Sequence, residues 1–191
     1  EAGFRMKALG NRIMEVVGGR AVHPVNVAVG GFHAWPDARA VRDLVPALEE
    51  GLADALALVA RVADLDFPAL GPEAEEVALV HPGEYPILDG RIASSAGLDA
   101  VAASFTDHFE ERQVPWSTAL QSVRLPAGTP YRVGPIARLN LCRDRLPHRA
   151  AAAADAAGFG RPERNPFRSI VARAVEIVAA CEEAHGVAES W

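Results

Sequence analysis

The sequence predicts a mainly α-helical fold with a minor β component (α+β), in which a helical bundle-like core accompanies a small β-hairpin or sheet. Long segments repeat apolar residues every three or four positions, as on one face of a helix, whereas only short segments alternate. Half of the 191 residues are hydrophobic, which is enough for a substantial core. No internal repeat or low-complexity linker divides the chain, so residues 1–191 are predicted to form a single unit.

The first predicted helix covers residues 1–17, where apolar residues recur mostly at three- and four-residue steps. Gly18 and Gly19 end this helix, because glycine readily takes the left-handed conformation that closes helices. Residues 18–32 then read GGRAVHPVNVAVGGF, in which two glycine pairs bracket an Arg, a His-Pro and an alternating apolar run. We expect a tight, buried loop that holds one guanidinium and one imidazole.

A second helical pattern covers residues 38–65. Trp35-Pro36-Asp37 supplies its start, with Asp37 as the N-cap, and Pro46 is expected to kink the helix or to divide it in two. Prolines and a glycine predict a loop over residues 66–76.

The predicted β-structure lies in the middle of the chain. The segments EVALVHP and YPILDGRIAS have the composition of strands, and Asp89-Gly90 signals a two-residue hairpin turn. A helical pattern begins at Asp99 and ends before Pro115, after which STALQSVRL alternates as a strand does. The next segment, TPYRVGPIARLNL, gives no clear periodicity.

Two further helices are predicted towards the end of the chain. Residues 147–157 form an alanine-rich helix that Gly158 closes. The last helix has Asn165 as its cap, Pro166 at its first position and apolar residues down one face as far as Cys181. We expect this helix to be buried along its length.

Composition excludes several functional classes. The chain has 19 basic and 25 acidic residues and no basic block, which argues against a nucleic-acid partner. The two cysteines form no CxxC pair, as is typical of a reduced, cytoplasmic protein. No signal peptide or membrane span is predicted. The mean hydropathy of +0.06 is apolar enough to suggest that other protein covers part of the surface.

Residue chemistry alone reveals no active site. The sequence contains no GxSxG, P-loop or HExxH motif and no strand followed by GxGxxG. Its six histidines never share one helical face at the spacing of a metal site. Cys142 and Cys181 lie in apolar settings that favour core packing over nucleophilic chemistry. Asp107, Glu110 and Glu111 are interpreted as a solvated helix face.

Five blocks of sequence carry a resemblance to a known family. In order they are LGNRIMEVVGGRAVHPVNVAVGGF, PGEYPILDGRIASSAGLD, STALQS, YRVGPIARLNL and NPFRSIVARAVEIVAACEEA. Together they resemble the large subunit of nickel–iron hydrogenases, in particular its cytosolic NAD(P)-linked and sulfhydrogenase-type branch. The resemblance covers essentially the whole chain. It implies a parent activity of reversible H₂ oxidation, with electrons passed to an iron–sulfur small subunit.

The resemblance also implies where the metals belong. In the family, four cysteine thiolates from two CxxC motifs, one towards each end of the subunit, hold a Ni–Fe(CN)₂(CO) centre. Neither motif occurs in this chain. We therefore expect a central segment that lacks both metal-binding segments, has no cofactor of its own and is inactive alone. The start without Met, within a helical pattern, leads us to expect that the beginning is missing.

Two interpretations of the chain remain open. It is either the central fragment of a hydrogenase large subunit or a non-catalytic hydrogenase-like scaffold that serves a small-subunit-like partner. In either case, helices that normally surround a buried centre are expected to expose apolar faces or to cover them by self-association.

The resemblance implies that the region of Arg20 and His23 lies towards the iron–sulfur small subunit. A ring N–H of His23 there would donate a hydrogen bond to a cluster sulfur or its cysteine ligand; a satisfied core histidine is the alternative. Arg20 and Arg138 either line the subunit interface or hold a carboxylate of their own chain, and we favour the structural role for Arg138. We assign the Gly30-Gly31 and Gly134-Pro135 pairs to close backbone packing, because they lack the strand-then-helix setting of a phosphate site.

Overall fold

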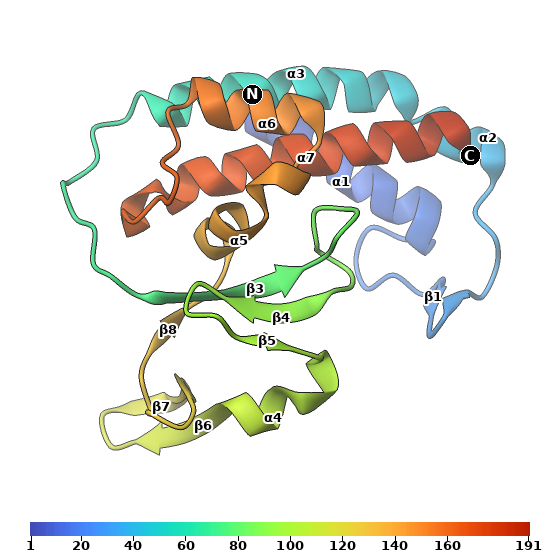
Figure 1. Cartoon of the computed structure of the whole chain (residues 1–191). Helices are drawn as coiled ribbons and strands as arrows, with labels where there is room; N and C mark the ends of the chain where they lie inside the picture. Colours follow the sequence, from blue (N-terminus) through green and yellow to red (C-terminus); the bar gives the residue numbers. More distant parts are fainter. The chain divides into compact units, whose positions relative to one another are not determined.

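The computed structural model describes residues 1–191 as two compact units (Figure 1). The first unit comprises Glu1–Leu65, Pro147–Ala157 and Ala174–Trp191. The second comprises Asp66–Leu146 and Gly158–Arg173. Because the chain passes between them repeatedly, neither unit is one continuous stretch, and the single-domain organisation stays a prediction.

Helices dominate the first unit, and its only strands are two short ones. The helices are α1 (Ala2–Gly18), α2 (Ala38–Arg42), α3 (Val45–Ala63), α6 (His148–Ala156) and the greater part of α7 (Ser169–Ser190). The strands β1 (Val27–Ala28) and β2 (Gly31–Phe32) pair antiparallel. A buried cluster joins residues of α1, α2, α3 and α7, namely Leu9, Val41, Leu44, Leu48 and Ala188.

The predicted helix ends of the first unit are confirmed. Gly19 is left-handed, with φ 84°, and its N–H closes α1 on the Glu15 carbonyl. The Asp37 carboxylate accepts from the Ala40 N–H at 2.8 Å and so caps α2. Pro46 lies in the first turn of α3, where its missing N–H is harmless, and the predicted long helix is divided there into α2 and α3.

The last helix begins as its sequence predicts. The Asn165 side chain accepts from the Phe167 N–H at 3.0 Å, a 3₁₀ turn η3 (Pro166–Arg168) follows, and α7 continues from it. Val171, Val175 and Val178 are fully buried, whereas Ile170 and Val187 are exposed. The helix is therefore buried along one face and not along its whole surface.

A carboxylate of α7 completes the start of α6. Glu182 accepts from the backbone N–H of Arg149 at 3.0 Å and of Ala150 at 3.3 Å, and Pro147 supplies no side-chain cap. We expect Glu182→Ala to lower the free energy of unfolding by about 1 kcal/mol, because helix N-terminal N–H groups lose an acceptor and a favourable charge. Thermal denaturation followed by circular dichroism would show the melting temperature fall by about 2–4 °C. Glu182→Gln keeps an acceptor and should lose less; equal losses would contradict the role of charge.

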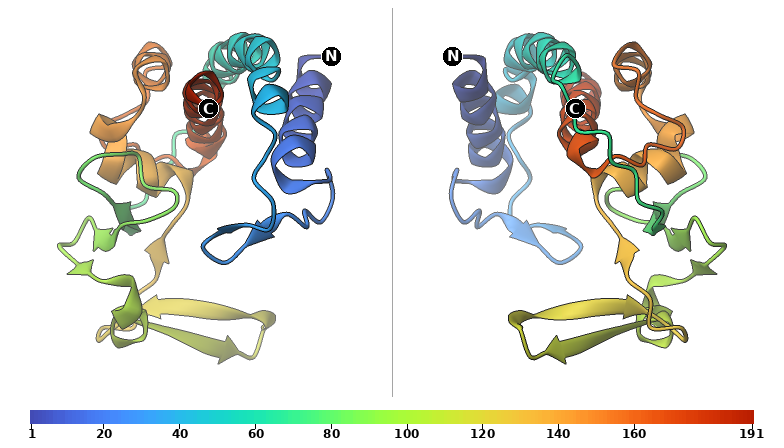
Figure 2. Two further views of the ribbon diagram at one scale, coloured as in Figure 1. Left: turned by 90° about the vertical axis from the view of Figure 1, so that its right-hand side faces the viewer. Right: turned by 90° about the vertical axis from the view of Figure 1, so that its left-hand side faces the viewer.

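A small mixed sheet organises the second unit. Its order is β5-β4-β3-β8, with β3 parallel to β8 and the other pairs antiparallel. The bounds are β3 (Glu75–Val80), β4 (Arg91–Ser94), β5 (Asp99–Ala100) and β8 (Tyr131–Arg132). Helix α5 (Pro135–Cys142) packs against β3. A separate antiparallel hairpin consists of β6 (Phe109–Val114) and β7 (Ser117–Arg124), drawn as a two-stranded ribbon in Figure 2. The remaining elements are η1 (Ala102–Ser104), α4 (Phe105–His108) and η2 (Arg143–Arg145).

Two local predictions in this unit are wrong. The turn at Asp89-Gly90 is not a two-residue hairpin, because Val80 pairs with Arg91 and a long loop joins β3 to β4. Gly90 is instead needed for a close approach, since a Cβ there would lie 2.7 Å from the Val80 carbonyl oxygen.

The helical pattern after Asp99 yields only η1 and α4. The chain is extended from Phe109 onwards because β6 pairs with β7, and pairing between distant segments overrides a local period. The unclear segment before α5 divides into β8 and the helix itself. The mainly α fold with a minor β component is confirmed, and no helix of the chain is long and apolar enough to cross a membrane.

Candidate functional site

The glycine-bracketed stretch forms a loop over residues 18–34, which we call the 18–34 loop. It leaves the end of α1, contains the β1–β2 pair and leads towards α2 (Figure 1). Gly18 allows close packing, because a Cβ there would lie 2.6 Å from the Pro24 Cβ. Gly30 has φ 81° in the turn between β1 and β2, with nothing near its Cβ position. Its role is conformational, which corrects the expected close packing.

The other predicted packing glycine also differs from expectation. Gly134 has φ 95° and open space around its Cβ position, so it too is selected by backbone conformation. It precedes Pro135, the first residue of α5.

Arg20 and His23 lie together in the 18–34 loop, and both are exposed. The Arg20 Nε donates to the His23 carbonyl oxygen at 2.5 Å. His23 has φ 51°, the left-handed region that non-glycine residues rarely adopt. The expectation of a buried loop is therefore wrong for this chain, and its guanidinium is directed to backbone and not to a carboxylate. That the two side chains face a partner stays a prediction.

Asn26 holds the ends of the loop together, and sequence reasoning did not identify it. Its Nδ2 donates to the carbonyl oxygens of Val17 at 2.9 Å and Ala34 at 2.8 Å. Its Oδ1 accepts from the Ala34 N–H at 2.9 Å. The backbone N–H groups of Val25 and Asn26 both donate to the Gly18 carbonyl oxygen. The only signal in the sequence is a single amide within an otherwise apolar VNVAV run.

The same loop exposes apolar side chains. Val22, Val25 and Val27 are more than half exposed, and Val29 is fully exposed. Exposed apolar residues grouped on one ordered segment are typical of a surface that contacts another protein. The expectation of exposed apolar surface is met at this loop.

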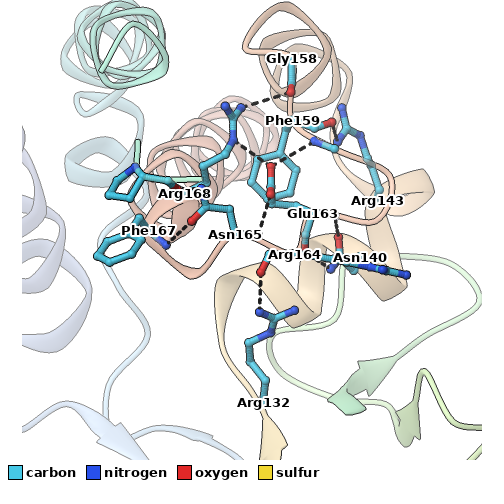
Figure 3. Close-up of polar contacts among 12 residues, drawn as sticks. Arg132, Asn140, Arg143, Gly158, Phe159, Glu163, Arg164, Asn165, Phe167 and Arg168 are labelled. Carbon is cyan, nitrogen blue, oxygen red and sulfur yellow. Dashed lines mark hydrogen bonds and ion pairs between the residues drawn. The ribbon is translucent and has the colours of Figure 1, made fainter. Parts of the chain in front are cut away.

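The second unit contains a buried polar network, part of which is shown in Figure 3. Glu76 on β3 is 4% exposed; it forms an ion pair with Arg132 of β8 and accepts from the Asn140 Nδ2 of α5 at 2.6 Å. Asn140 also bonds the backbone of Glu163, accepting its N–H and donating to its carbonyl, each at 2.9 Å. One amide therefore joins α5, the sheet and the segment that leads to α7.

Glu163 extends this network towards α7. Its carboxylate accepts from the Asn165 N–H at 2.9 Å and lies 2.8 Å from the Arg168 Nε. Arg143, 6% exposed, donates to the Phe159 carbonyl oxygen at 2.9 Å. These charges are satisfied within the chain, so the network is a structural brace and not a reactive site.

Arg138 lies beside a mainly apolar pocket of about 580 Å³ in the second unit. Its lining includes Val77, Leu79, Phe105 and Gly134. A more polar pocket of about 470 Å³ is lined by Glu76, Arg132 and Arg164, among others. The groups of the second pocket are those that the polar network already uses.

The cysteines do not fit a metal–thiolate centre. Cys142 and Cys181 are both buried and belong to different units. Burial raises the pKa of both thiols, that of Cys142 to about 11, and the Cys142 Sγ donates to the Leu79 carbonyl oxygen at 3.2 Å. No three His, Cys, Asp or Glu side chains gather as metal ligands. The residues present therefore do not match the four thiolates of a nickel–iron centre.

The raised pKa of Cys142 gives a direct test of its inertness. In a Cys181→Ala variant at pH 8, the remaining thiol should react with a disulfide reagent only when urea unfolds the chain, because the reactive thiolate is suppressed. The unfolded thiol ionises near its ordinary 9.0 and the folded one near 11. Stability from the buried thiol is therefore present below pH 9 and lost as the pH rises through 11. Rapid modification of the folded chain would contradict this assignment.

Comparison with known proteins identifies the relatives of this chain. It is 28% identical over 198 residues to a protein of the vhc F420-non-reducing hydrogenase of Methanococcus voltae, a match that covers 93% of this chain and 41% of that protein. It is also 28% identical over 186 residues to the alpha chain of sulfhydrogenase 1 of Pyrococcus furiosus, covering 96% of this chain and 43% of the relative. The chain thus spans less than half the length of these relatives. No family model matches.

A solved structure supports the same fold. The chain aligns with a TM-score of 0.83 and 24% identity to the structure of an NAD⁺-reducing [NiFe]-hydrogenase in its H₂-reduced state. The alignment covers 98% of this chain and 46% of that one. The sequence matches come from subunits of hydrogenases and extend over nearly all of the chain. The chain is therefore a partial homologue of the large, or alpha, subunit of nickel–iron hydrogenases.

Proposed function

We propose that the chain serves as the central part of a nickel–iron hydrogenase large subunit, within a complex that oxidises H₂ reversibly and passes the electrons to an iron–sulfur small subunit. The observation that carries this proposal is the match to hydrogenase subunits over 93–96% of the chain. We place the protein in the cytoplasm, which its two buried, unpaired cysteines support.

The metal centre belongs, in this proposal, to the complete parent subunit. The chain alone binds neither nickel nor iron and does not turn over H₂. Its donor set supports this view, because the two cysteines belong to different units and Cys142 is held protonated beside Leu79. No step of H₂ chemistry is assigned to residues of this chain.

The partner-facing role falls to the 18–34 loop. Arg20 and His23 are exposed on it, next to the exposed valines, which supports a surface that another subunit covers. In this arrangement the His23 ring N–H donates a hydrogen bond towards the nearest iron–sulfur cluster, and Arg20 holds the His23 backbone.

Binding to an iron–sulfur small subunit tests this proposal. We would immobilise the recombinant small subunit from the same organism and measure the dissociation constant of the full chain by biolayer interferometry. His23→Ala should weaken binding about tenfold or more if the imidazole lies at the centre of the interface. His148→Ala, an exposed histidine at the start of α6, is the matched control and should bind as the wild type does. Failure of the wild-type chain to bind would refute the proposed role.

A non-catalytic scaffold is the second candidate function. It is favoured by the apolar clusters that each unit forms from its own residues and by the internal hydrogen bonds of the 18–34 loop. Both candidates predict binding to a small subunit. They differ in one assay: H₂-dependent dye reduction by the native complex that contains this chain supports the hydrogenase role, whereas a stable complex without that activity supports the scaffold.

A further inference from the structure

The 18–34 loop obtains its order from hydrogen bonds and not from burial of its apolar side chains. Loops that expose apolar residues normally either collapse onto the body of the protein or stay mobile. Here the valines point to solvent while the backbone is fixed by the Gly18 carbonyl, the Asn26 amide and the β1–β2 pair. The apolar side chains are therefore left available, although the loop is ordered.

Asn26 is the centre of this order. Its amide pairs with both the N–H and the carbonyl of Ala34, as a strand backbone would, and its third bond reaches Val17 at the end of α1. In addition, the Asn26 carbonyl accepts from the His33 N–H at 2.8 Å. One half-buried side chain thus closes both ends of the loop on the helix that precedes it.

The closure acts on the segment that contains His23. The Gly18 carbonyl accepts from Val25 and Asn26, so residues 19–24 form a short closed loop beside α1. Within it, contact between Gly18 and Pro24 and the bond from Arg20 to the His23 carbonyl hold His23 in its left-handed conformation. A non-glycine residue keeps such a conformation only where its surroundings enforce it.

We propose that Asn26 is a positioning residue that locks the 18–34 loop into its partner-binding shape before the partner arrives, so that His23 and the exposed valines form one rigid docking surface. This inference rests on the proposed function, in which the iron–sulfur small subunit is the occupant. Binding to a surface that is already ordered avoids the entropy loss of ordering it, and affinity rises accordingly. Asn26 itself need not touch the partner.

Hydrogen exchange on the full chain tests the locking without a partner. In the wild type, the amides of Val25, Asn26, His33 and Ala34 should exchange slowly, because each donates a hydrogen bond. In Asn26→Ala these four should exchange at least about tenfold faster while the amides of α3 do not change. Asn26→Asp keeps the acceptor for Ala34 but places a carboxylate against two carbonyl oxygens, and it should behave as the alanine variant does. Unchanged protection in both variants would overturn the inference.

Binding to the recombinant iron–sulfur small subunit tests the purpose of the locking. Asn26→Ala should raise the dissociation constant about tenfold or more, because binding must then order the loop. The matched control is Asn165→Ala, which also removes two side-chain hydrogen bonds, but in the second unit. It should bind as the wild type does even if its melting temperature falls.

The outcomes separate this inference from the proposed function. If the wild-type chain binds and Asn26→Ala binds equally tightly, the inference fails while the proposed function stands. If the Asn165 control weakens binding as much as Asn26→Ala does, the effect is one of general stability and the inference also fails. If the wild-type chain does not bind the small subunit, the proposed function is refuted and the docking role with it.

Discussion

Replacing Arg132 by methionine is expected to lower the free energy of unfolding by about 3–5 kcal/mol, because it leaves a buried carboxylate without its cation. Glu76 is 4% exposed, and its ion pair with Arg132 joins β3 to β8. The methionine has nearly the same length as the stem of the arginine, so the change removes charge more than packing. Urea denaturation monitored by circular dichroism would measure the difference.

The second unit offers a matched control for this variant. Arg164 also pairs with a glutamate, Glu73, at 3.2 Å, but both side chains are largely exposed. Arg164→Met should therefore change the free energy of unfolding by at most about 1 kcal/mol. Adding Glu76→Gln to Arg132→Met should recover part of the loss, since the uncompensated charge is removed. Equal effects of the two single arginine variants would refute the assigned importance of burial.

Replacing Asn140 by alanine is the second large effect, with an expected loss of about 3 kcal/mol, because buried partners lose their hydrogen bonds. The amide of Asn140 serves Glu76 and both backbone groups of Glu163, and the residue lies on α5 between them. The same denaturation experiment applies. A loss below about 1 kcal/mol would indicate that water replaces the amide.

An Asn140→Asp variant adds a pH signature to this test. A carboxylate at position 140 would face the Glu76 carboxylate, and repulsion between like charges raises the pKa of one of them. A carboxyl whose folded pKa is raised stabilises the fold below its unfolded pKa and loses that contribution as the pH rises. The deficit of Asn140→Asp should therefore be greatest at neutral pH and shrink under acid conditions. A deficit that does not vary with pH would contradict this arrangement.

Local signals predicted the helices well. Gly19, Asp37 and Asn165 act through hydrogen bonds to residues within four positions, so the sequence nearby contains the whole interaction. Strand β6 was not predicted, because its extended form depends on β7 beyond the turn, and its own spacing of apolar residues resembles a helix. The role of Gly90 was likewise hidden, since it depends on the approach of Val80.

The candidate site could be predicted only in part. Two glycine pairs correctly indicated an unusual backbone around Arg20 and His23, since glycine at such positions reflects local conformation. The role of Asn26 could not be deduced, because its partners at Val17 and Ala34 are known only once the loop is closed. The exposure of the loop could not be deduced either, because the pattern of a covered interface and that of a core strand are the same.

The metal content of the purified chain tests the proposed division of labour most directly. The chain would be produced in cells that assemble nickel–iron hydrogenases, and nickel and iron would be measured by inductively coupled plasma mass spectrometry. The cysteines of different units and the protonated Cys142 thiol predict no stoichiometric nickel or iron in this chain. One nickel atom per chain would contradict that prediction and would place the reaction centre within these 191 residues.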